Sequence, residues 1–538
     1  MKGLVAMNAW GRWSARLGAV ALAAMLAGCQ TMPGLSVMGG ADIPLAGPLP
    51  PPEPRQWPDA DADVLNARAR NYGLVDMPEM QKYLNGLLAR IKTAAGVPDW
   101  PGQVYVLAAQ PLDAYASAAG NVYVSWSWLA SAQSEDEIVA LLSHEYGHVY
   151  LHYHQLEGAV RTTDTVASLA SLTVALVKDT AKQTGWTAVD SLAAGYVMSR
   201  EVISSAWGRS QEAAADSWGA HVSTKLGYSF GAGYQAFFER VISWEAENAE
   251  RQTAQRKALL EQVKAQAAQS VRAAQTGQGA AQNLLAEPMV GLSQLVDGAL
   301  HQGTVGLGDL WKTVTSSHPD TVGRLESLAV KFAELPAWED PEPITKPWDQ
   351  ARRQRRTAAL LDSYRQAYHA LGNLEDPKAL EAARAAAKGP AANHAVPLKA
   401  LYSAQMAAAA KRGNTRGRQD PLAPLDRNLG SERDRTWLSV TERAEQLYEN
   451  GRREQARQVM ARGFEFFRNA GEAWPAAVSF YGRTAGWDEA QRMAQECRKR
   501  FASYAQACAD AARSPAERQR AEQDSKKKSK QIVDGWFK

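Results

Sequence analysis

Ala140-Leu-Leu-Ser-His-Glu-Tyr-Gly-His-Val-Tyr-Leu-His-Tyr-His154 is the stretch of sequence that decides the fold. Within it, the pattern His144-Glu145-x-x-His148 puts two histidines four residues apart, and such positions lie on one face of a helix. Both imidazoles can therefore bind one metal ion, while Glu145 lies beside a water on that ion as a general base. The alternative is a surface helix with two unrelated histidines, because four-residue patterns also recur by accident.

A third metal ligand elsewhere in the chain would favour a metal site over a surface helix with two unrelated histidines. His154 follows His148 by six residues, but Leu151 stands where a glycine would be needed to turn the chain back, so His154 is excluded. An Ala-rich helix further along supplies a carboxylate instead, because Glu212 lies 64 residues beyond His148 and Asp216 is its i+4 neighbour. We expect Glu212 to bind the metal and Asp216 to hold a ligand histidine through its second ring nitrogen. A solvated acidic face is the alternative.

Several segments of the chain match one known pattern in order. They are Asp113-Ala-Tyr-Ala with Gly120–Ser125, Glu135–Val149, Arg209–Asp216 and Ser317–Leu325. Together they resemble the BepA/HtpX-like zinc endopeptidases, a gluzincin group, over residues 75–328. The resemblance implies a mostly α (α+β) fold, with a zincin-like metallopeptidase domain and a small sheet. It also implies one zinc ion per chain, held by His144, His148 and Glu212. Asp113 replaces the usual Asn of the family, and residues 245–314 look like a helical insertion.

His318-Pro319 lies in the last of these segments. Proline restricts the backbone here, so the imidazole is held at a set angle on a loop that the resemblance places near the metal. We hypothesise that His318 is a regulatory latch or fourth ligand at the open metal position, or that it stabilises the oxyanion. A loop-capping histidine is the alternative. Arg324 is expected to bind either the Asp216 region or a substrate carbonyl.

Residues 1–28 have the composition of a bacterial lipoprotein signal peptide. A positively charged start precedes an apolar run, too short to span a membrane, that ends at Leu26-Ala-Gly-Cys29. We expect cleavage before Cys29 and lipidation of its thiol; an ordinary signal peptide with an incidental cysteine is the alternative. Gln30 favours sorting to the outer membrane. Residues 29–58 are rich in Pro and Gly and are predicted to form an extended tether.

Apolar periodicity predicts the elements around the metal helix. Residues 59–95 have helical spacing with an interruption near Pro78, and Val104–Leu107 and Asn121–Ser125 are predicted strands. Substrates of such proteases add to an edge strand, and residues 115–124 are the candidate edge. A core hairpin with no substrate role fits the same pattern.

The C-terminal part of the chain is helical and Ala-rich. Tyr448–Ala456 and Gly482–Ala490 align at a shift of 34 residues and share small-residue positions, which indicates tetratricopeptide-like helix pairs. A plain helical bundle is the alternative. Cys497 and Cys508 are predicted to form a disulfide, because the expected compartment permits one.

Composition and these motifs divide the chain into six predicted segments. They are a signal peptide (1–28), a tether (29–58), a metallopeptidase domain (59–334, with the insertion at about 245–314), a linker (335–355), α-helical tetratricopeptide-like repeats (356–513) and a basic tail (514–538). With 538 residues, 45% of them hydrophobic, the chain is long enough for several cores. The net charge of +3 argues against a nucleic-acid partner.

The predicted function is that of a lipid-anchored, periplasmic zinc endopeptidase that cleaves unfolded or misassembled envelope proteins. By resemblance, its setting is outer-membrane protein quality control, with the assembly machinery as a partner through the repeats. One alternative is a chaperone or assembly factor whose protease site is latent. A metallohydrolase acting on peptidoglycan is a second alternative, although no segment resembles a glycan-binding module.

Overall fold

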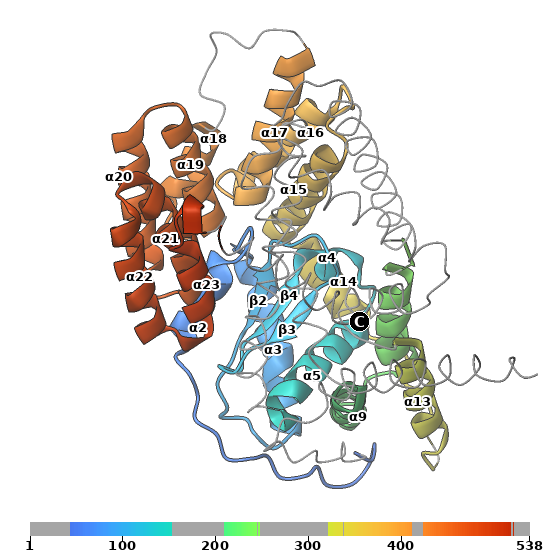
Figure 1. Cartoon of the computed structure of the whole chain (residues 1–538). Helices are drawn as coiled ribbons and strands as arrows, with labels where there is room; N and C mark the ends of the chain where they lie inside the picture. The colour runs from blue at the N-terminus through green and yellow to red at the C-terminus, as the bar shows by residue number, and fades with distance from the viewer. Residues whose placement is uncertain are drawn as a thin grey trace, which may run out of the picture. The chain divides into compact units, whose positions relative to one another are not determined.

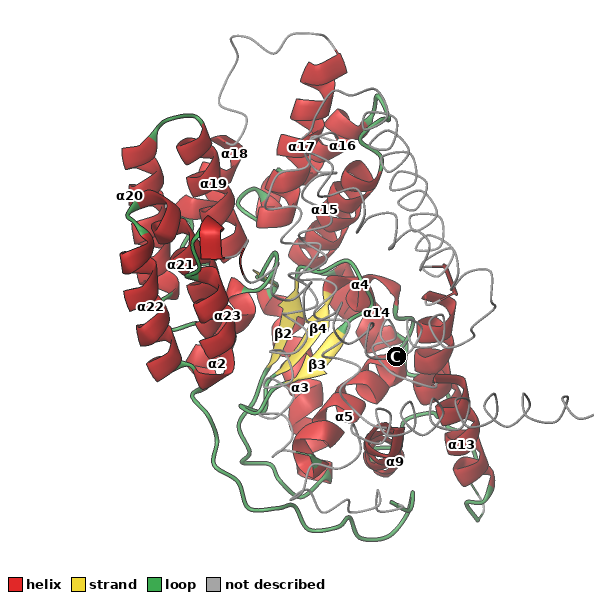
Figure 2. Ribbon diagram, in the orientation of Figure 1, coloured by secondary structure: helices red, strands yellow, loops and turns green. Residues whose placement is uncertain are grey.

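The computed structural model describes residues 43–152, 209–244, 246–247, 321–336, 338–411, 423–517 and 520. The predicted signal peptide, Cys29, His154, His318, most of the insertion and most of the basic tail lie outside these residues. Within them the fold is mostly helical with one small mixed sheet, which confirms the predicted class (Figure 2). No helix in the described ranges is both long and apolar enough to cross a bilayer.

In the described ranges, the sheet has four short strands. They are β1 (Leu74–Val75), β2 (Val104–Leu107), β3 (Ala114–Ala116) and β4 (Val122–Ser125), in the spatial order β1-β2-β4-β3. β2 and β4 are parallel and the other two pairs are antiparallel. β3 is therefore an edge strand, and it holds Tyr115 and Ala116 from the predicted substrate edge, whereas β4 is interior.

The predicted helix at residues 59–95 is two helices with a turn and β1 between them. α2 (Ala60–Ala69) begins after Asp59, whose side chain accepts hydrogen bonds from the first-turn amides, and α3 (Pro78–Ala94) has Pro78 in its first turn. The chain reverses at Gly73, which has a φ of 71° that disfavours other residues. α3 packs on β2, while α5 (Glu135–Leu151) packs on β3 and β4 (Figure 1).

α5 is the central helix of the peptidase part. Its residues from Glu135 to Tyr150 are all buried, and Ser134 caps its first turn. The backbones of α5 and α9 (Arg209–Lys225) lie close together, because Gly147 has no side chain where it faces α9. A Cβ at Gly147 would lie 3.0 Å from the Ala215 carbonyl oxygen. This close contact brings the two predicted ligand helices together.

Further helices complete the same core. They are α4 (Trp126–Ser131), the π-helix η1 (Gly231–Gln235), α13 (Thr321–Ala333), α14 (Lys346–Arg353), α15 (Arg355–Gly372), α16 (Ala379–Ala386) and α17 (Ala395–Lys411). α14 lies in the segment predicted to be a linker, and this segment is packed: Trp348 is fully buried and its indole donates to the Ala132 carbonyl at 2.9 Å. The hydrophobic core that starts at Ile43 continues as far as Ala404.

The remaining helices form a separate set of hydrophobic clusters. They are α18 (Ala423–Gly430), α19 (Trp437–Glu449), α20 (Arg453–Phe467), α21 (Trp474–Thr484), α22 (Trp487–Arg500) and α23 (Ala505–Ala511), with the three-residue 3-10 turns η3 (Gly471–Ala473) and η4 (Ala502–Tyr504). The 3-10 turn η2 (Gly389–Ala391) instead packs in the peptidase core through Ala391. The two aligned units correspond to the packed pairs α19–α20 and α21–α22. Cys497 on α22 and Cys508 on α23 form a disulfide. The repeat assignment itself stays a prediction.

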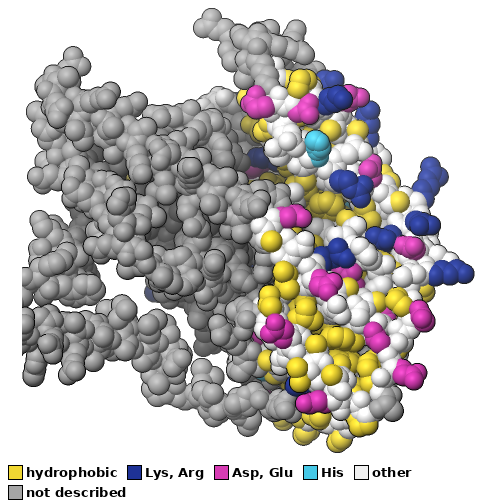
Figure 3. Space-filling model, turned by 90° about the vertical axis from the view of Figure 1, so that its right-hand side faces the viewer, with side chains coloured by type: hydrophobic (Ala, Val, Ile, Leu, Met, Phe, Trp, Pro, Cys, Tyr) yellow, Lys and Arg dark blue, Asp and Glu magenta, His cyan; other side chains and the backbone are white. Residues whose placement is uncertain are grey.

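The N-terminal described segment is packed at its start, whereas α13 exposes two valines. Residues 43–58, the second half of the predicted tether, lie against the peptidase core, because Ile43 and Leu45 are buried in it. The start of the predicted tether is therefore packed, whereas residues 46–58 are exposed or half-buried. By contrast, the side chains of Val322 and Val330 on α13 are more than half exposed. The face drawn in Figure 3 carries hydrophobic side chains among scattered acidic and basic ones.

Candidate metal centre

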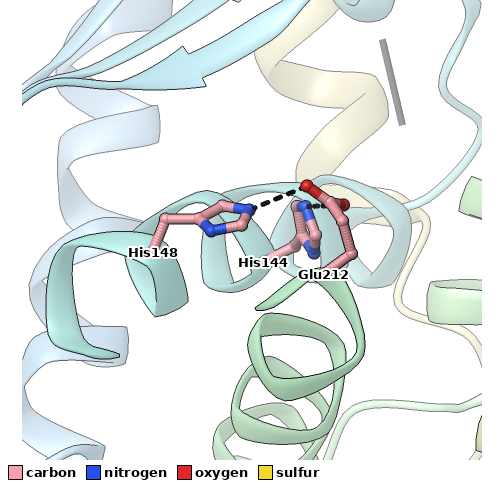
Figure 4. Close-up of side chains that lie close together, drawn as sticks. All are labelled: His144, His148 and Glu212. Carbon is pink, nitrogen blue, oxygen red and sulfur yellow. Dashed lines mark ion pairs between the residues drawn. The ribbon is translucent and has the colours of Figure 1, made fainter. Parts of the chain in front are cut away.

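Two helices supply the three predicted ligands. His144 and His148 project from α5, and Glu212 projects from the first turn of α9 toward them (Figure 4). Glu212 lies 3.6 Å from Nε2 of His144 and 3.5 Å from Nε2 of His148. One ligand atom from each residue lies within 4.8 Å of the other two, and all three side chains are buried. The i,i+4 spacing and the close contact of the helices produce this cluster.

The donor set fits zinc. Two imidazole nitrogens and one carboxylate are the ligands of catalytic zinc sites, which keep a fourth position for water or substrate. Burial lowers the pKa of His144 below its ordinary value, although the nearby Asp216 carboxylate opposes this shift. A lowered pKa favours the neutral imidazole, which is the form that binds metals. His144, His148 and Glu212 would therefore hold one zinc ion.

Asp216 lies behind His144, as the sequence predicted for a residue that holds a ligand histidine. Its Oδ1 is 2.8 Å from Nδ1 of His144, while Nε2 of the same ring faces Glu212. A proton on Nδ1 leaves the lone pair of Nε2 for the metal. The Asp216 carboxylate thus fixes both the tautomer and the orientation of His144.

Arg324 on α13 binds both acidic residues of α9. Its Nε and Nη2 donate to the two oxygens of Asp216 at 2.7 Å each, and its Nη1 lies 2.8 Å from Oε2 of Glu212. Burial alone would raise the pKa of Asp216, but the Arg324 charge and hydrogen bonds hold it below its ordinary value. Of the two roles that the sequence left open, the structure supports contact with the Asp216 region.

Comparison with known proteins identifies this arrangement. Residues 78–331 match the model of peptidase family M48. This part of the chain belongs to peptidase family M48. A protein of Vibrio cholerae serotype O1 named as a beta-barrel assembly-enhancing protease is 28% identical over 175 residues. The match covers 32% of this chain and 34% of that relative, so the chain spans about a third of the relative's length. The M48 domain here keeps an intact His-His-Glu zinc site.

Glu145, the predicted general base, lies within the matched segment. It is 2% exposed, it adjoins the ligand His144, and its Oε1 makes no hydrogen bond within the described residues. Zinc in such a site supplies Lewis acidity, which makes a water proton acidic near neutral pH. Glu145 can accept that proton and return it to the amine that leaves when a peptide bond breaks. Its role as the general base stays a prediction.

Two further histidines, His152 and His318, are candidates for a role near the metal ligands. His152 ends α5, and its Nε2 lies 3.3 Å from the Gln211 carbonyl. Burial and the neighbouring His148 lower the pKa of His152 to about 4. It packs beside the site without joining the ligand cluster. His318, the predicted latch, lies outside the described residues.

Proposed function

We propose that the chain is a lipid-anchored periplasmic endopeptidase that cleaves unfolded or misassembled envelope proteins. The observation that carries this proposal is the buried cluster of His144, His148 and Glu212 with Glu145 beside it. This is the minimal apparatus for metal-assisted peptide hydrolysis: three ligands, an open position and a carboxylate base.

The sheet supports binding through the substrate backbone. Among the described residues, β3 pairs with β4 on one side only, and it packs against the metal helix α5. An extended peptide can add to such an edge through main-chain hydrogen bonds, which ignore side-chain identity. Backbone-directed recognition suits unfolded chains, since these present extended segments of many sequences.

Three observations support the proposed location. The start of the chain has lipoprotein-signal composition ending at Cys29. The Cys497–Cys508 disulfide is typical of oxidising compartments such as the periplasm. The name of the Vibrio cholerae relative refers to beta-barrel assembly. We therefore propose an outer-membrane anchor and a role in quality control of outer-membrane proteins.

The helices after α18 are proposed to bind partners. Consecutive helix pairs of the tetratricopeptide kind stack into surfaces that accept protein segments. In support, α19 packs on α20 and α21 packs on α22, and the aligned Ala456 and Ala490 are both buried. Outer-membrane assembly machinery is the proposed partner class, and His318 is proposed as a latch on the zinc site.

The function is tested by zinc content and casein cleavage of the mature chain, in wild type and in Glu145→Gln. We expect one zinc per chain in both, and a loss of cleavage by roughly 10²- to 10⁴-fold in the variant, because only the general base is removed. Glu79→Gln, an exposed change on α3, is the matched control and should cleave normally.

Other outcomes separate the alternatives. One zinc without cleavage in either protein would favour an assembly factor with a latent site. His318→Ala should then restore cleavage if His318 is the latch. Wild-type protein without zinc after metal repletion would overturn the proposal altogether.

A further inference from the structure

Residues 43–57, which we call the N-terminal strap, contact all three helices that build the zinc site. The helices are α5, which carries His144 and His148, α9, which carries Glu212, and α13, which carries Arg324. Ile43 and Leu45 of the strap are 2% and 5% exposed, and both belong to the peptidase core. The strap is therefore part of the folded domain.

The first residues of the strap join α9 to α13. The Pro44 carbonyl accepts a hydrogen bond from Nδ1 of His221 on α9 at 2.8 Å. The Ile43 carbonyl accepts one from Lys331 on α13 at 3.4 Å, and the same ammonium group donates to Ser217 on α9 at 2.9 Å. These contacts link the helix of Glu212 to the helix of Arg324.

Arg55, near the end of the strap, caps the metal helix. Its guanidinium donates to the Val149 carbonyl and, at 3.0 Å, to the Tyr150 carbonyl, the last turn of α5. In return, the Tyr150 hydroxyl donates to the Pro50 carbonyl at 2.9 Å. The guanidinium also lies 4.0 Å from the centre of the Trp100 ring, which holds it in place.

The location of this cap matters for the zinc site. The last carbonyls of a helix have no intrahelical donor, so the final turn frays unless another group satisfies them. A cation there also interacts favourably with the helix dipole. His148 is in this turn, directly before Val149. Fraying of the turn would move one of the two histidine ligands.

We propose that the strap is a positioning element of the zinc site, and that Arg55 is its positioning residue for His148. The inference rests on the zinc site of the proposed function, but it does not require proteolysis. It assigns a role to a Pro-rich segment whose composition alone indicates a spacer. Arg55 acts through the backbone of α5 and touches neither zinc nor substrate.

The test compares zinc release from the full chain and from Arg55→Ala, followed with a chromogenic chelator. We expect release to be roughly fivefold faster in the variant, because the last turn of α5 loses both a hydrogen-bond donor and a favourable cation. Hydrogen exchange of the last amides of α5 should also accelerate, without a matching change elsewhere. Arg55→Lys keeps the charge and should recover part of the effect, and Tyr150→Phe should show a smaller change in the same direction.

Arg353→Ala is the matched control, because this arginine is on α14 and its side chain is 81% exposed. Equal zinc release and equal exchange in Arg55→Ala, Tyr150→Phe and wild type would overturn the proposal. A uniform loss of protection over the whole chain would also overturn it, since that result indicates a general stability effect. If Arg55→Ala does not fold, Arg55→Lys and Tyr150→Phe carry the same comparison. Wild-type protein that binds zinc but cleaves nothing would count against the proposed function and leave this test intact.

Discussion

Arg324 is a fully buried cation whose two partners are the ligand Glu212 and the orienting residue Asp216. Without Arg324, both buried carboxylates would lose a positively charged partner. Removing one partner of a buried charge cluster is strongly destabilising, typically by about 3–5 kcal/mol, because the remaining charge is uncompensated. Groups that orient metal ligands also change metal affinity by about 10- to 100-fold. Arg324 is therefore expected to affect both stability and zinc binding.

We predict that Arg324→Met lowers zinc affinity by about 10- to 100-fold and lowers the unfolding temperature of the apoprotein. Arg324→Lys keeps the charge but loses the planar fork that meets both oxygens of Asp216, so it should be intermediate. Chelator competition and thermal unfolding, each with and without zinc, measure these effects. Unchanged zinc affinity in Arg324→Met would show that the arginine does not support the ligands.

At the scale of elements, the disulfide joins α22, which has 14 residues, to α23, which has seven. Cys497 and Cys508 are 11 residues apart, and both are buried in a small cluster with Trp474 and Val478. Closing a loop of this size stabilises a fold by about 3 kcal/mol in the chain-entropy account. α23 has only seven residues, so it contributes few contacts of its own.

We predict that the double variant Cys497→Ser, Cys508→Ser loses about 3 kcal/mol of unfolding free energy in the C-terminal helices. Urea unfolding measures this loss, and zinc content should stay the same, because the site lies in a different hydrophobic cluster. Reductant should reproduce the loss in wild type and have no effect on the double variant. An identical urea midpoint in both proteins would contradict the prediction.

At the scale of the whole molecule, the peptidase core extends past the predicted domain boundary at residue 334. Trp348 on α14 and Leu360 on α15 are fully buried in the core that also contains the metal helix. Large buried side chains of this kind each stabilise a fold by about 3–5 kcal/mol. A peptidase segment without α14–α17 would expose that surface to water.

We predict that a chain of residues 30–334 neither unfolds cooperatively nor binds zinc, whereas a chain of residues 30–411 does both. Calorimetry and zinc content of the two purified fragments provide the measurement. Cooperative unfolding and full zinc content in the shorter fragment would instead support the boundary that the sequence predicted.

The sequence by itself determined the chemistry of this protein. His144, Glu145 and His148 follow from local helical spacing, and Glu212 follows from a second motif on one helix, so each could be predicted without knowing how the helices pack. β2 and β4 are also predictable locally, because their β-branched and aromatic residues favour strands. β1 was missed because two residues carry no period.

Only the tertiary structure decided which groups support that chemistry. Arg324 meets Asp216 across 108 residues, and Arg55 meets Tyr150 across 95. Trp348 donates to Ala132 across 216 residues, in a segment whose prolines and charges predicted a linker. Such contacts depend on how helices and loops pack, and neither composition nor periodicity encodes the packing of distant segments. The ligands are set by local spacing, whereas the groups that hold them in place are set by long-range packing.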